Sequence, residues 1–312
     1  MRGVAALTGG TGFLGPHIAE ALAAEGWRVR LLVRRPPTEI PHGAELVEGH
    51  LGDGAALIRL VEGADVVVHA AGLIKARSLD EFMAVNRDGS SNLARAVRTV
   101  RPGMRVVALS SLAAREPLLS DYAASKLAGE QALAGLANLM ILRPPAVYGP
   151  GDRETGLFLR AAFGPILPIP KVPQARICLI HAADLARAVV ALCAWRMTGC
   201  LEVSDSRTDG YGWRELAEQI IAAAHGTAHI VELPAMVLRS FGALGAAAPK
   251  LIGRTAMLGP GKVRELLHPD WASRRDAQPP AEMWQPRVGL AEGLAQTMAW
   301  LREREVLACA MN

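Results

Sequence analysis

The stretch Thr8-Gly9-Gly10-Thr11-Gly12-Phe13-Leu14-Gly15 decides the fold of this 312-residue chain. It follows a short apolar segment, residues 4–7, that predicts a buried strand, and it opens an amphipathic segment, residues 14–25, that predicts a helix. Glycines at such a turn allow the tight bend, the approach of backbone to a pyrophosphate and the close packing of helix on strand. The free N–H groups of the helix then face the phosphates. The stretch therefore predicts a dinucleotide site.

The same alternation of strand and helix continues through the first half of the chain. Further strands are expected at residues 28–33, 45–47, 65–69, 105–109 and 139–142, with helices at 55–61, 79–100 and 122–136. Short apolar strands that alternate with longer helices are typical of a parallel sheet covered on both faces. We therefore expect an α/β fold with a doubly wound parallel sheet of the Rossmann type.

The amino-acid composition changes after Arg143, where prolines become frequent. They stand at positions 144, 145, 150, 165, 168, 170 and 173, in a segment that cannot form a long helix. We expect a dinucleotide-binding domain over residues 1–148, with 177–196 packing back on it, and a smaller mixed substrate lobe over 149–312. Helices are expected at 182–195, 213–224, 235–244, 262–267 and 290–304.

Composition narrows the class of protein. The net charge of +4 favours anionic partners such as phosphorylated cofactors, and the aromatic content of 4% argues against a stacking platform for nucleic acid. Four cysteines show no Cys-x-x-Cys spacing, which argues against a metal site or a disulfide framework and fits a reducing cytoplasm. We expect a cytoplasmic protein without metal, as a monomer or a homodimer.

Membrane contact is expected only at the surface. Residues 1–7 run into the expected first strand, so we expect no signal peptide, and no uncharged apolar run reaches the ~18 residues that a membrane span needs. The nearest stretch, residues 235–258, is interrupted by Arg239, Lys250 and Arg254. Basic charge and apolar segments in the second lobe permit peripheral contact with the inner face of a membrane.

Tyr122 and Lys126 form the clearest catalytic pattern. They are four residues apart and share one face of the expected helix. An ammonium beside a phenol stabilises the phenolate, so that a group with a pKa near ~10 can exchange a proton closer to neutrality. Ser111, at the end of the strand 105–109, can place a hydroxyl beside the phenol to polarise a carbonyl. Asn86 is a helix-borne amide that could support the site.

The end of the second strand bears on the cofactor. It reads Leu32-Val33-Arg34-Arg35, without the carboxylate that would bind the ribose of NAD. Two guanidinium groups there can hold a 2′-phosphate. The sequence therefore favours NADP(H) over NAD(H), and leaves NAD(H) open.

Two other sites are not supported. His181 and Asp184 lack a third ligand at metal spacing, and a helix start explains them better. The Gly-x-Ser-x-Gly elbow of an esterase is absent.

Together these motifs make the chain resemble the extended short-chain dehydrogenase/reductase family, along nearly its whole length. Within that family it resembles the NAD-dependent epimerases and dehydratases, and in style the ketone reductases, the hydroxysteroid dehydrogenases and an accessory subunit of respiratory complex I. The matching motifs are the glycine turn, His69-Ala70-Ala71-Gly72, Val85-Asn86, Ser110-Ser111, Tyr122-x-x-x-Lys126, Arg143-Pro144-Pro145-Ala146-Val147-Tyr148-Gly149-Pro150-Gly151 and Trp284-x-Pro286.

The resemblance implies a nicotinamide cofactor and Ser111, Tyr122 and Lys126 as the catalytic set. It also implies a set of residues around the cofactor, some of them named above: Gly9, Gly12, Phe13, Leu14, Gly15, Arg34, Arg35, Leu51, Ala70, Ala71, Gly72, Asn86, Tyr122, Lys126, Pro145 and Val147. One position departs from the family. Where the family has an Asp that meets adenine after the third strand, this chain has His50, and Asp53 is too far along to take that role.

A second departure concerns the substrate. Sugar-nucleotide epimerases of the family carry an Asn that binds diphosphate in the turn where this chain has Ala146. Residues 230–238 and 241–244 offer apolar surface instead of polar groups for a sugar. We therefore expect an NADP(H)-dependent oxidoreductase of lipid metabolism that interconverts a ketone and a secondary alcohol on a sterol-like or 3-keto sphingoid or ceramide-type substrate. A nucleotide-sugar epimerase or dehydratase, and a non-catalytic NADPH-binding subunit, stay open as alternatives.

Overall fold

A seven-stranded sheet positions the candidate site. Its strand order is β11-β6-β5-β4-β1-β2-β3, and every neighbouring pair is parallel. From β1 (Gly3–Thr8) the chain continues to β2 (Trp27–Val33) and β3 (Glu45–Glu48) on one side, then returns to β4 (Val66–His69) on the other. The predicted doubly wound parallel sheet is confirmed. Its order reverses between β1 and β4, which is where ligands bind in such folds.

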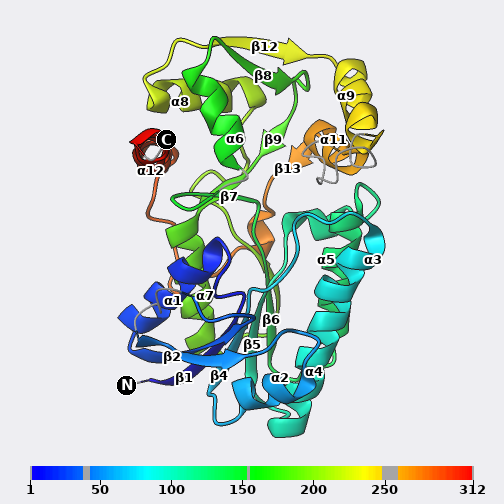
Figure 1. The fold of residues 1–312 in the computed structure, drawn as a ribbon, viewed down its shortest axis with the longest axis vertical. Helices are drawn as coiled ribbons and strands as arrows, with labels where there is room; N and C mark the ends of the chain where they lie inside the picture. The colour runs from blue at the N-terminus through cyan, green and yellow to red at the C-terminus, as the bar shows by residue number, and fades with distance from the viewer. Residues whose placement is uncertain (1, 38–42, 153–154, 248–258, 311–312) are drawn as a thin grey trace. The chain divides into compact units, whose positions relative to one another are not determined.

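The computed structural model describes residues 2–37, 43–152, 155–247 and 259–310. The remaining strands of the sheet are β5 (Arg105–Leu109), β6 (Leu139–Arg143) and β11 (Gly199–Glu202). The helices that accompany it are α1 (Leu14–Ala24), α2 (Gly54–Val61), α3 (Leu79–Met83), α4 (Gly89–Val100), α5 (Asp121–Leu133) and α7 (Ala182–Ala194). In Figure 1, α2, α4 and α5 cover one face of the sheet, and α1 and α7 lie on the other.

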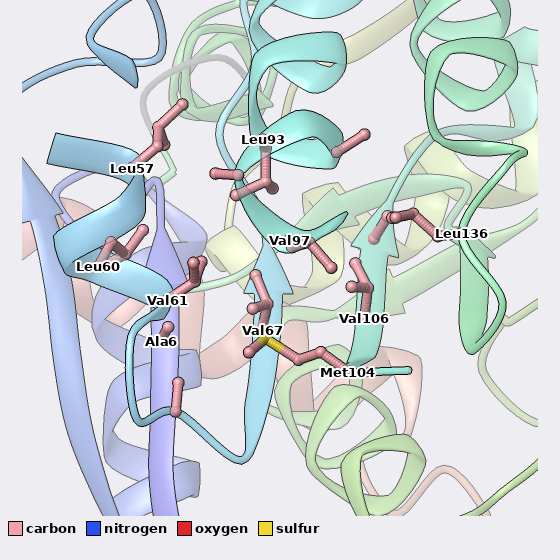
Figure 2. Packing of buried hydrophobic residues seen from close by; sticks show 14 of the residues in the cluster. Ala6, Leu57, Leu60, Val61, Val67, Leu93, Val97, Met104, Val106 and Leu136 are labelled. Carbon is pink, nitrogen blue, oxygen red and sulfur yellow. The ribbon is translucent and has the colours of Figure 1, made fainter. Parts of the chain in front are cut away.

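The core on the α2 and α4 side explains why these segments are helical. Leu57, Leu60 and Val61 form the apolar stripe of α2, and Leu93 and Val97 form that of α4, all of them fully buried. Figure 2 draws these side chains together with Ala6 of β1, Val67 of β4 and Val106 of β5. A stripe that recurs every three to four residues buries one face of a helix on a sheet, and removing one such leucine costs ~2–5 kcal/mol.

The segment predicted as one helix, residues 79–100, is helical throughout, but its centre is wound as a π-helix. A π-helical turn, Ala84–Asp88, separates α3 from α4. Gly129 of α5 comes so close here that a Cβ atom on it would lie 2.7 Å from the carbonyl oxygen of Asn86. The Ser90 hydroxyl donates to that same carbonyl at 2.6 Å. Single π turns occur in helices often at functional sites, and this one carries Asn86.

The chain divides into two compact units. The first comprises residues 1–144, 185–203 and 277–285, and the second comprises 145–184, 204–276 and 286–312. Strands of the second unit form three parallel pairs: β7 (Ala146–Tyr148) with β10 (Leu179–His181), β8 (Ile166–Pro170) with β12 (His229–Leu233), and β9 (Arg176–Ile177) with β13 (Asp270–Trp271). Its further helices are α6 (Thr155–Arg160), α8 (Trp213–Ala224), α9 (Ala235–Ala247), α11 (Pro260–Leu267) and α12 (Leu290–Ala310). Short 3₁₀ turns occur at Leu112–Arg115, Ala161–Phe163 and Arg275–Ala277.

The second unit has an apolar core of its own and an apolar surface on α9. Its core includes Tyr148, Leu167 and Leu294. Met236, Phe241 and Leu244 of α9 are 75%, 53% and 67% exposed. The stretch 235–258 singled out above continues past α9 into residues 248–258, which lie outside the described residues. Within the described part of the chain, no helix is both long enough and apolar enough to cross a membrane.

Candidate active site

The turn after β1 requires its glycines. Gly9 has φ +80°, and a Cβ atom on it would lie 2.6 Å from the backbone nitrogen of Ala71. A Cβ atom on Gly15 would collide with the backbone of Gly10. The turn is closed by hydrogen bonds from the Gly12 N–H to Gly9 O at 3.0 Å and from the Gly15 N–H to Gly12 O at 3.1 Å. Only residues without a side chain permit this approach of backbone to backbone.

The helix that follows presents an uncapped N-terminus. Helix α1 begins at Leu14, the preceding Phe13 gives no side-chain cap, and no acidic residue stands in the first turn. Its first N–H groups and its dipole thus favour an anion. Both observations fit the pyrophosphate of a dinucleotide, for which Gly9, Gly12, Phe13, Leu14 and Gly15 were predicted.

Arg34 and Arg35 follow β2 directly, and both are exposed. No carboxylate stands beside them in the chain. This is the position at which a guanidinium can meet a 2′-phosphate. Leu51 is half-buried against Gly89, and its carbonyl accepts a hydrogen bond from Asn92 at 3.0 Å. Asp53 accepts from the Ala56 N–H at 3.0 Å as the cap of α2, so its carboxylate already has a structural role.

The segment after β4 lies between the glycine turn and Lys126. Ala70 and Ala71 lie against Gly9. At Gly72, a Cβ atom would come within 3.1 Å of Asn86 Oδ1 and 3.7 Å of Lys126 Nζ. The glycine turn and Lys126 therefore border the same short segment.

Ser111 stands at the carboxyl end of the sheet, two residues after β5. The neighbouring strand holds it there, because Ser110 N–H donates to Leu142 O at 2.8 Å and Leu112 N–H to Pro144 O at 2.9 Å. The Ser111 oxygen accepts from the Ala113 N–H at 3.2 Å, which begins a short 3₁₀ turn. That bond does not use the hydroxyl hydrogen, so this hydrogen can be donated to a ligand.

Tyr122 lies in the first turn of α5 and is partly exposed. The side chain of Ser120 caps this helix by accepting from the Ala123 N–H at 3.0 Å. The phenol ring lies beside Phe82, with 6.1 Å between the ring centroids. Ordered packing and a capped helix thus fix the start of the segment that carries Tyr122 and Lys126 on one face.

Lys126 is held by a strand end. Its Nζ donates to the carbonyl oxygen of Leu109 at 2.9 Å. Burial lowers its pKa to about 8, although the carboxylate of Glu130 acts in the opposite direction. An ammonium with a pKa near neutrality can retain its charge at physiological pH and still exchange its proton.

Asn86 uses its whole carboxamide within the protein. Its Oδ1 accepts from the Leu73 N–H at 2.8 Å, and its Nδ2 donates to Leu73 O at 3.0 Å and to Ser125 Oγ at 2.8 Å. Ser125 in turn donates to the carbonyl of Tyr122 at 2.7 Å. Asn86 thereby ties the segment after β4 to the helix that carries Tyr122.

The sequence reasoning missed Glu130. This buried carboxylate, one helical turn beyond Lys126, accepts from the Ser110 hydroxyl and, in a two-bond pair, from Arg143 Nε at 2.8 Å and Nη2 at 2.6 Å. The spacing Tyr122, Lys126, Glu130 at intervals of four was the available signal. It indicates one face of α5 with a phenol, an ammonium and a carboxylate in succession.

Pro145 and Val147, also expected at the cofactor, belong to the second unit. Val147 is partly buried in β7, opposite Ile180 of β10. No group of three or more His, Cys, Asp or Glu side chains suited to a metal ion occurs among the residues that the structure describes.

The chain belongs to the extended short-chain dehydrogenase/reductase family. A model of the NAD-dependent epimerase/dehydratase family matches residues 5–199. The chain is accordingly an enzyme, an oxidoreductase of a family that binds NAD(P).

Two curated relatives are reductases. The chain is 46% identical to the ceramide reductase of Caulobacter vibrioides, over 96% of this chain and 95% of the relative. It is 33% identical to the 4-hydroxy-2-methyl-3-oxo-4-farnesyl-3,4-dihydroquinoline-1-oxide ketoreductase of Stigmatella aurantiaca, over 47% of this chain and 51% of the relative.

Solved structures share the fold. The Bordetella bronchiseptica enzyme WbmH in complex with NAD+ has a TM-score of 0.70 at 24% identity, covering 97% of this chain and 99% of that one. MoeE5 in complex with UDP-glucuronic acid and NAD has a TM-score of 0.69 at 20% identity, covering 97% of this chain and 99% of that one.

Proposed function

We propose that this enzyme uses NADPH to reduce a ketone to a secondary alcohol on a lipid-like substrate of the 3-keto sphingoid or ceramide type. The observation that carries this is the 46% identity to a ceramide reductase along nearly the full length of both chains. The residues described above supply a donor, a proton source and a charge at one end of the sheet, which is what carbonyl reduction needs.

Ser111, Tyr122 and Lys126 each have a separate role in the proposed reduction. NADPH, when bound, supplies the hydride. The Ser111 hydroxyl donates a hydrogen bond to the carbonyl oxygen, and Tyr122 gives that oxygen its proton. Lys126 stabilises the phenolate that remains and hydrogen-bonds the cofactor ribose. Asn86 and Ser125 hold α5 in place through the backbone of Tyr122.

NADP(H) is favoured over NAD(H) by the end of β2. Arg34 and Arg35 are exposed there. A 2′-phosphate gains two charge-assisted contacts at such a pair, whereas the 2′-hydroxyl of NAD lacks its usual carboxylate.

The second unit supports an apolar substrate. Ala146 has no group to hydrogen-bond a sugar diphosphate, and it is exposed in β7. The exposed apolar side chains of α9 also support peripheral contact with the membrane in which such a lipid resides.

The experiment is turnover by the purified protein. NADPH oxidation is followed with an N-acyl 3-keto sphingoid base, a 3-keto sphingoid base or a 3-keto sterol, and the alcohol is identified by mass spectrometry. We expect a secondary alcohol from a sphingoid-type ketone, and we expect Tyr122→Phe to abolish turnover while NADPH still binds. Full activity of Tyr122→Phe would contradict the assignment.

The same preparation tests the alternatives. Thermal stabilisation by UDP- or dTDP-sugars, with turnover of these and not of lipids, would establish the epimerase or dehydratase reading. Bound NADPH without turnover of any ketone, together with copurification in a membrane complex, would establish a non-catalytic subunit.

A further inference from the structure

A buried chain of hydrogen bonds crosses the first unit beneath the candidate site. It joins Thr8 at the end of β1, His69 at the end of β4 and Ser90 in the first turn of α4. These side chains are 0%, 4% and 3% exposed. Thr8 Oγ1 lies 2.8 Å from His69 Nδ1, and His69 Nε2 lies 3.0 Å from Ser90 Oγ.

The hydrogen-bond partners of Ser90 determine which atoms donate and which accept along this chain of hydrogen bonds. The hydroxyl of Ser90 donates its hydrogen to the carbonyl of Asn86 at 2.6 Å, because a carbonyl can only accept. The Ser90 oxygen must therefore accept from His69, so Nε2 of the imidazole carries a hydrogen. Histidine tautomers are assigned from such networks.

The imidazole is neutral. Burial and the nearby ammonium of Lys126 lower the pKa of His69 to about 3. With Nε2 protonated, the other ring nitrogen, Nδ1, accepts from the Thr8 hydroxyl. The Thr8 oxygen in turn accepts from the Ala71 N–H at 3.3 Å. The side chains of Thr8, His69 and Ser90 thus each have defined donors and acceptors.

Both ends of the chain reach the candidate site. At one end are Thr8, which enters the glycine turn, and Ala71, which lies against Gly9. At the other end is Asn86, whose carboxamide holds the helix of Tyr122 through Ser125. A buried histidine that served the core alone would not need to link these two segments.

The charged groups that face His69 come from α5. A small cavity of about 20 Å³ is bordered by His69 and Ser90 together with Lys126 and Glu130. Both nitrogens of His69 are already engaged, so the ring is not available as a general acid, a general base or a metal ligand.

We propose that His69, as its neutral Nε2–H tautomer, is a positioning residue that holds the cofactor turn and the Asn86 helix turn in fixed relation. This proposal rests on the proposed function only because that function makes the first segment a cofactor site and the second a catalytic site. The hydroxyls of Thr8 and Ser90 transmit this positioning to the two sides.

The first test uses hydroxyl deletions with a matched control. Thr8→Val removes the hydrogen bonds of the Thr8 hydroxyl to His69 and to the Ala71 N–H and keeps the shape of the side chain, and Thr8→Ser restores the hydroxyl. Thr297→Val is the control, since Thr297 is equally buried and donates to Gly293 O at 2.7 Å in the other unit. We expect Thr8→Val to weaken NADPH binding ~10-fold, Thr8→Ser to stay within ~3-fold of wild type, and Thr297→Val to leave affinity unchanged.

A further variant separates the two ends of the chain. Ser90→Ala should lower kcat ~10-fold with NADPH affinity within ~2-fold, because Ser90 contacts the turn of Asn86 and not the cofactor turn. Equal NADPH affinities in wild type, Thr8→Val and Thr297→Val, with kcat unchanged in Ser90→Ala, would overturn the proposal.

The second test does not depend on turnover. The protein is labelled with ¹⁵N-histidine, and the ring nitrogens of His69 are identified by comparison with His69→Gln. We expect a neutral ring with hydrogen on Nε2 from about pH 5.5 to 8, below and above the ordinary histidine pKa. A ring with hydrogen on Nδ1 alone, or one that titrates in this range, would overturn the proposal. The expected spectrum together with weakened NADPH binding in Thr8→Val, but without reduction of any ketone, would leave this proposal standing and refute only the reaction.

Discussion

The carboxamide of Asn86 donates a 2.8 Å hydrogen bond to the hydroxyl of Ser125, and this hydroxyl donates its own hydrogen to the carbonyl of Tyr122 at 2.7 Å. The proton source of the proposed reaction is therefore located by an amide on another helical turn. That amide is itself held by both backbone groups of Leu73. The placement of Tyr122 depends on the segment after β4 as well as on its own helix.

Asn86→Ala should impair this arrangement more than Ser125→Ala. The first removes three hydrogen bonds and leaves the N–H and carbonyl of Leu73 without partners, whereas the second leaves the Leu73 bonds intact. We expect kcat to fall ~10–100-fold for Asn86→Ala and less than ~10-fold for Ser125→Ala. Steady-state kinetics with thermal unfolding of both variants checks this, and the reverse ranking would contradict it.

Arg34→Ala and Arg35→Ala should change cofactor preference. Each removes a guanidinium at the end of β2 and touches no core residue. We expect the KM for NADPH to rise ~10-fold or more and the KM for NADH to change less than ~2-fold, because only NADPH carries the 2′-phosphate. Arg28→Ala, earlier on the same strand and also exposed, is the control. Equal effects on both cofactors would rule out the assignment.

Lys126 should impose an alkaline limit on reduction. Its folded pKa is about 8, below the ordinary 10.5, so its charge is lost as pH rises through 8. We expect kcat for reduction to decline above about pH 8. Lys126→Arg, which stays charged, should be slower at neutral pH and lack this decline. Conversely, the free energy of unfolding should rise between pH 8 and 10.5, where the unfolded chain binds more protons.

Glu130→Gln should destabilise the protein and lower the pH above which kcat declines. Glu130 and Arg143 are 9% and 16% exposed, and removing one charge of a buried pair costs about 3 kcal/mol. The pKa of Lys126 should fall further, since Glu130 now raises it. Urea unfolding and the pH profile of kcat measure both effects. Glu25→Gln, in an exposed pair with Arg2, should cost no more than about 1 kcal/mol.

His69 should make the protein sensitive to acid. Its pKa is about 3 in the folded chain and 6.5 otherwise, so the unfolded chain binds the extra proton as pH falls below 6.5. Stability is lost at ~1.4 kcal/mol per pH unit in that window. The gap in unfolding free energy between wild type and His69→Gln should therefore narrow by roughly 2 kcal/mol from pH 6.5 to 5. A constant gap in urea unfolding at both pH values would contradict this.

Local patterns were sufficient to predict the sheet and its glycine turn. Short apolar strands, amphipathic helices and the glycines between them act within a few residues of one another, so their spacing carries the information. The Tyr122–Lys126 spacing is local in the same way. Ser111, Arg34 and Arg35 were predicted from their places at strand ends, and other cofactor residues such as Ala70 and Gly72 from the family resemblance. All of these site assignments stay predictions.

Contacts between distant segments could not be predicted from spacing. The π turn at Ala84–Asp88 meets Gly129, far along the chain, and the tautomer of His69 depends on Thr8 and Ser90 from two other elements. Glu130 finds Arg143 and Ser110 only once β5 and β6 are paired. The seventh strand, Gly199–Glu202, was missed because its apolar signal is short.

At Gly129 the π turn and α5 meet backbone to backbone, without an intervening layer of side chains. Two helices in such contact cannot slide along one another, because shear between helices proceeds by small rearrangements of the side chains between them. The segment that carries Tyr122 and Lys126 is therefore fixed relative to the turn that carries Asn86. Any rearrangement of the enzyme during turnover is expected to leave this segment and the turn of Asn86 together.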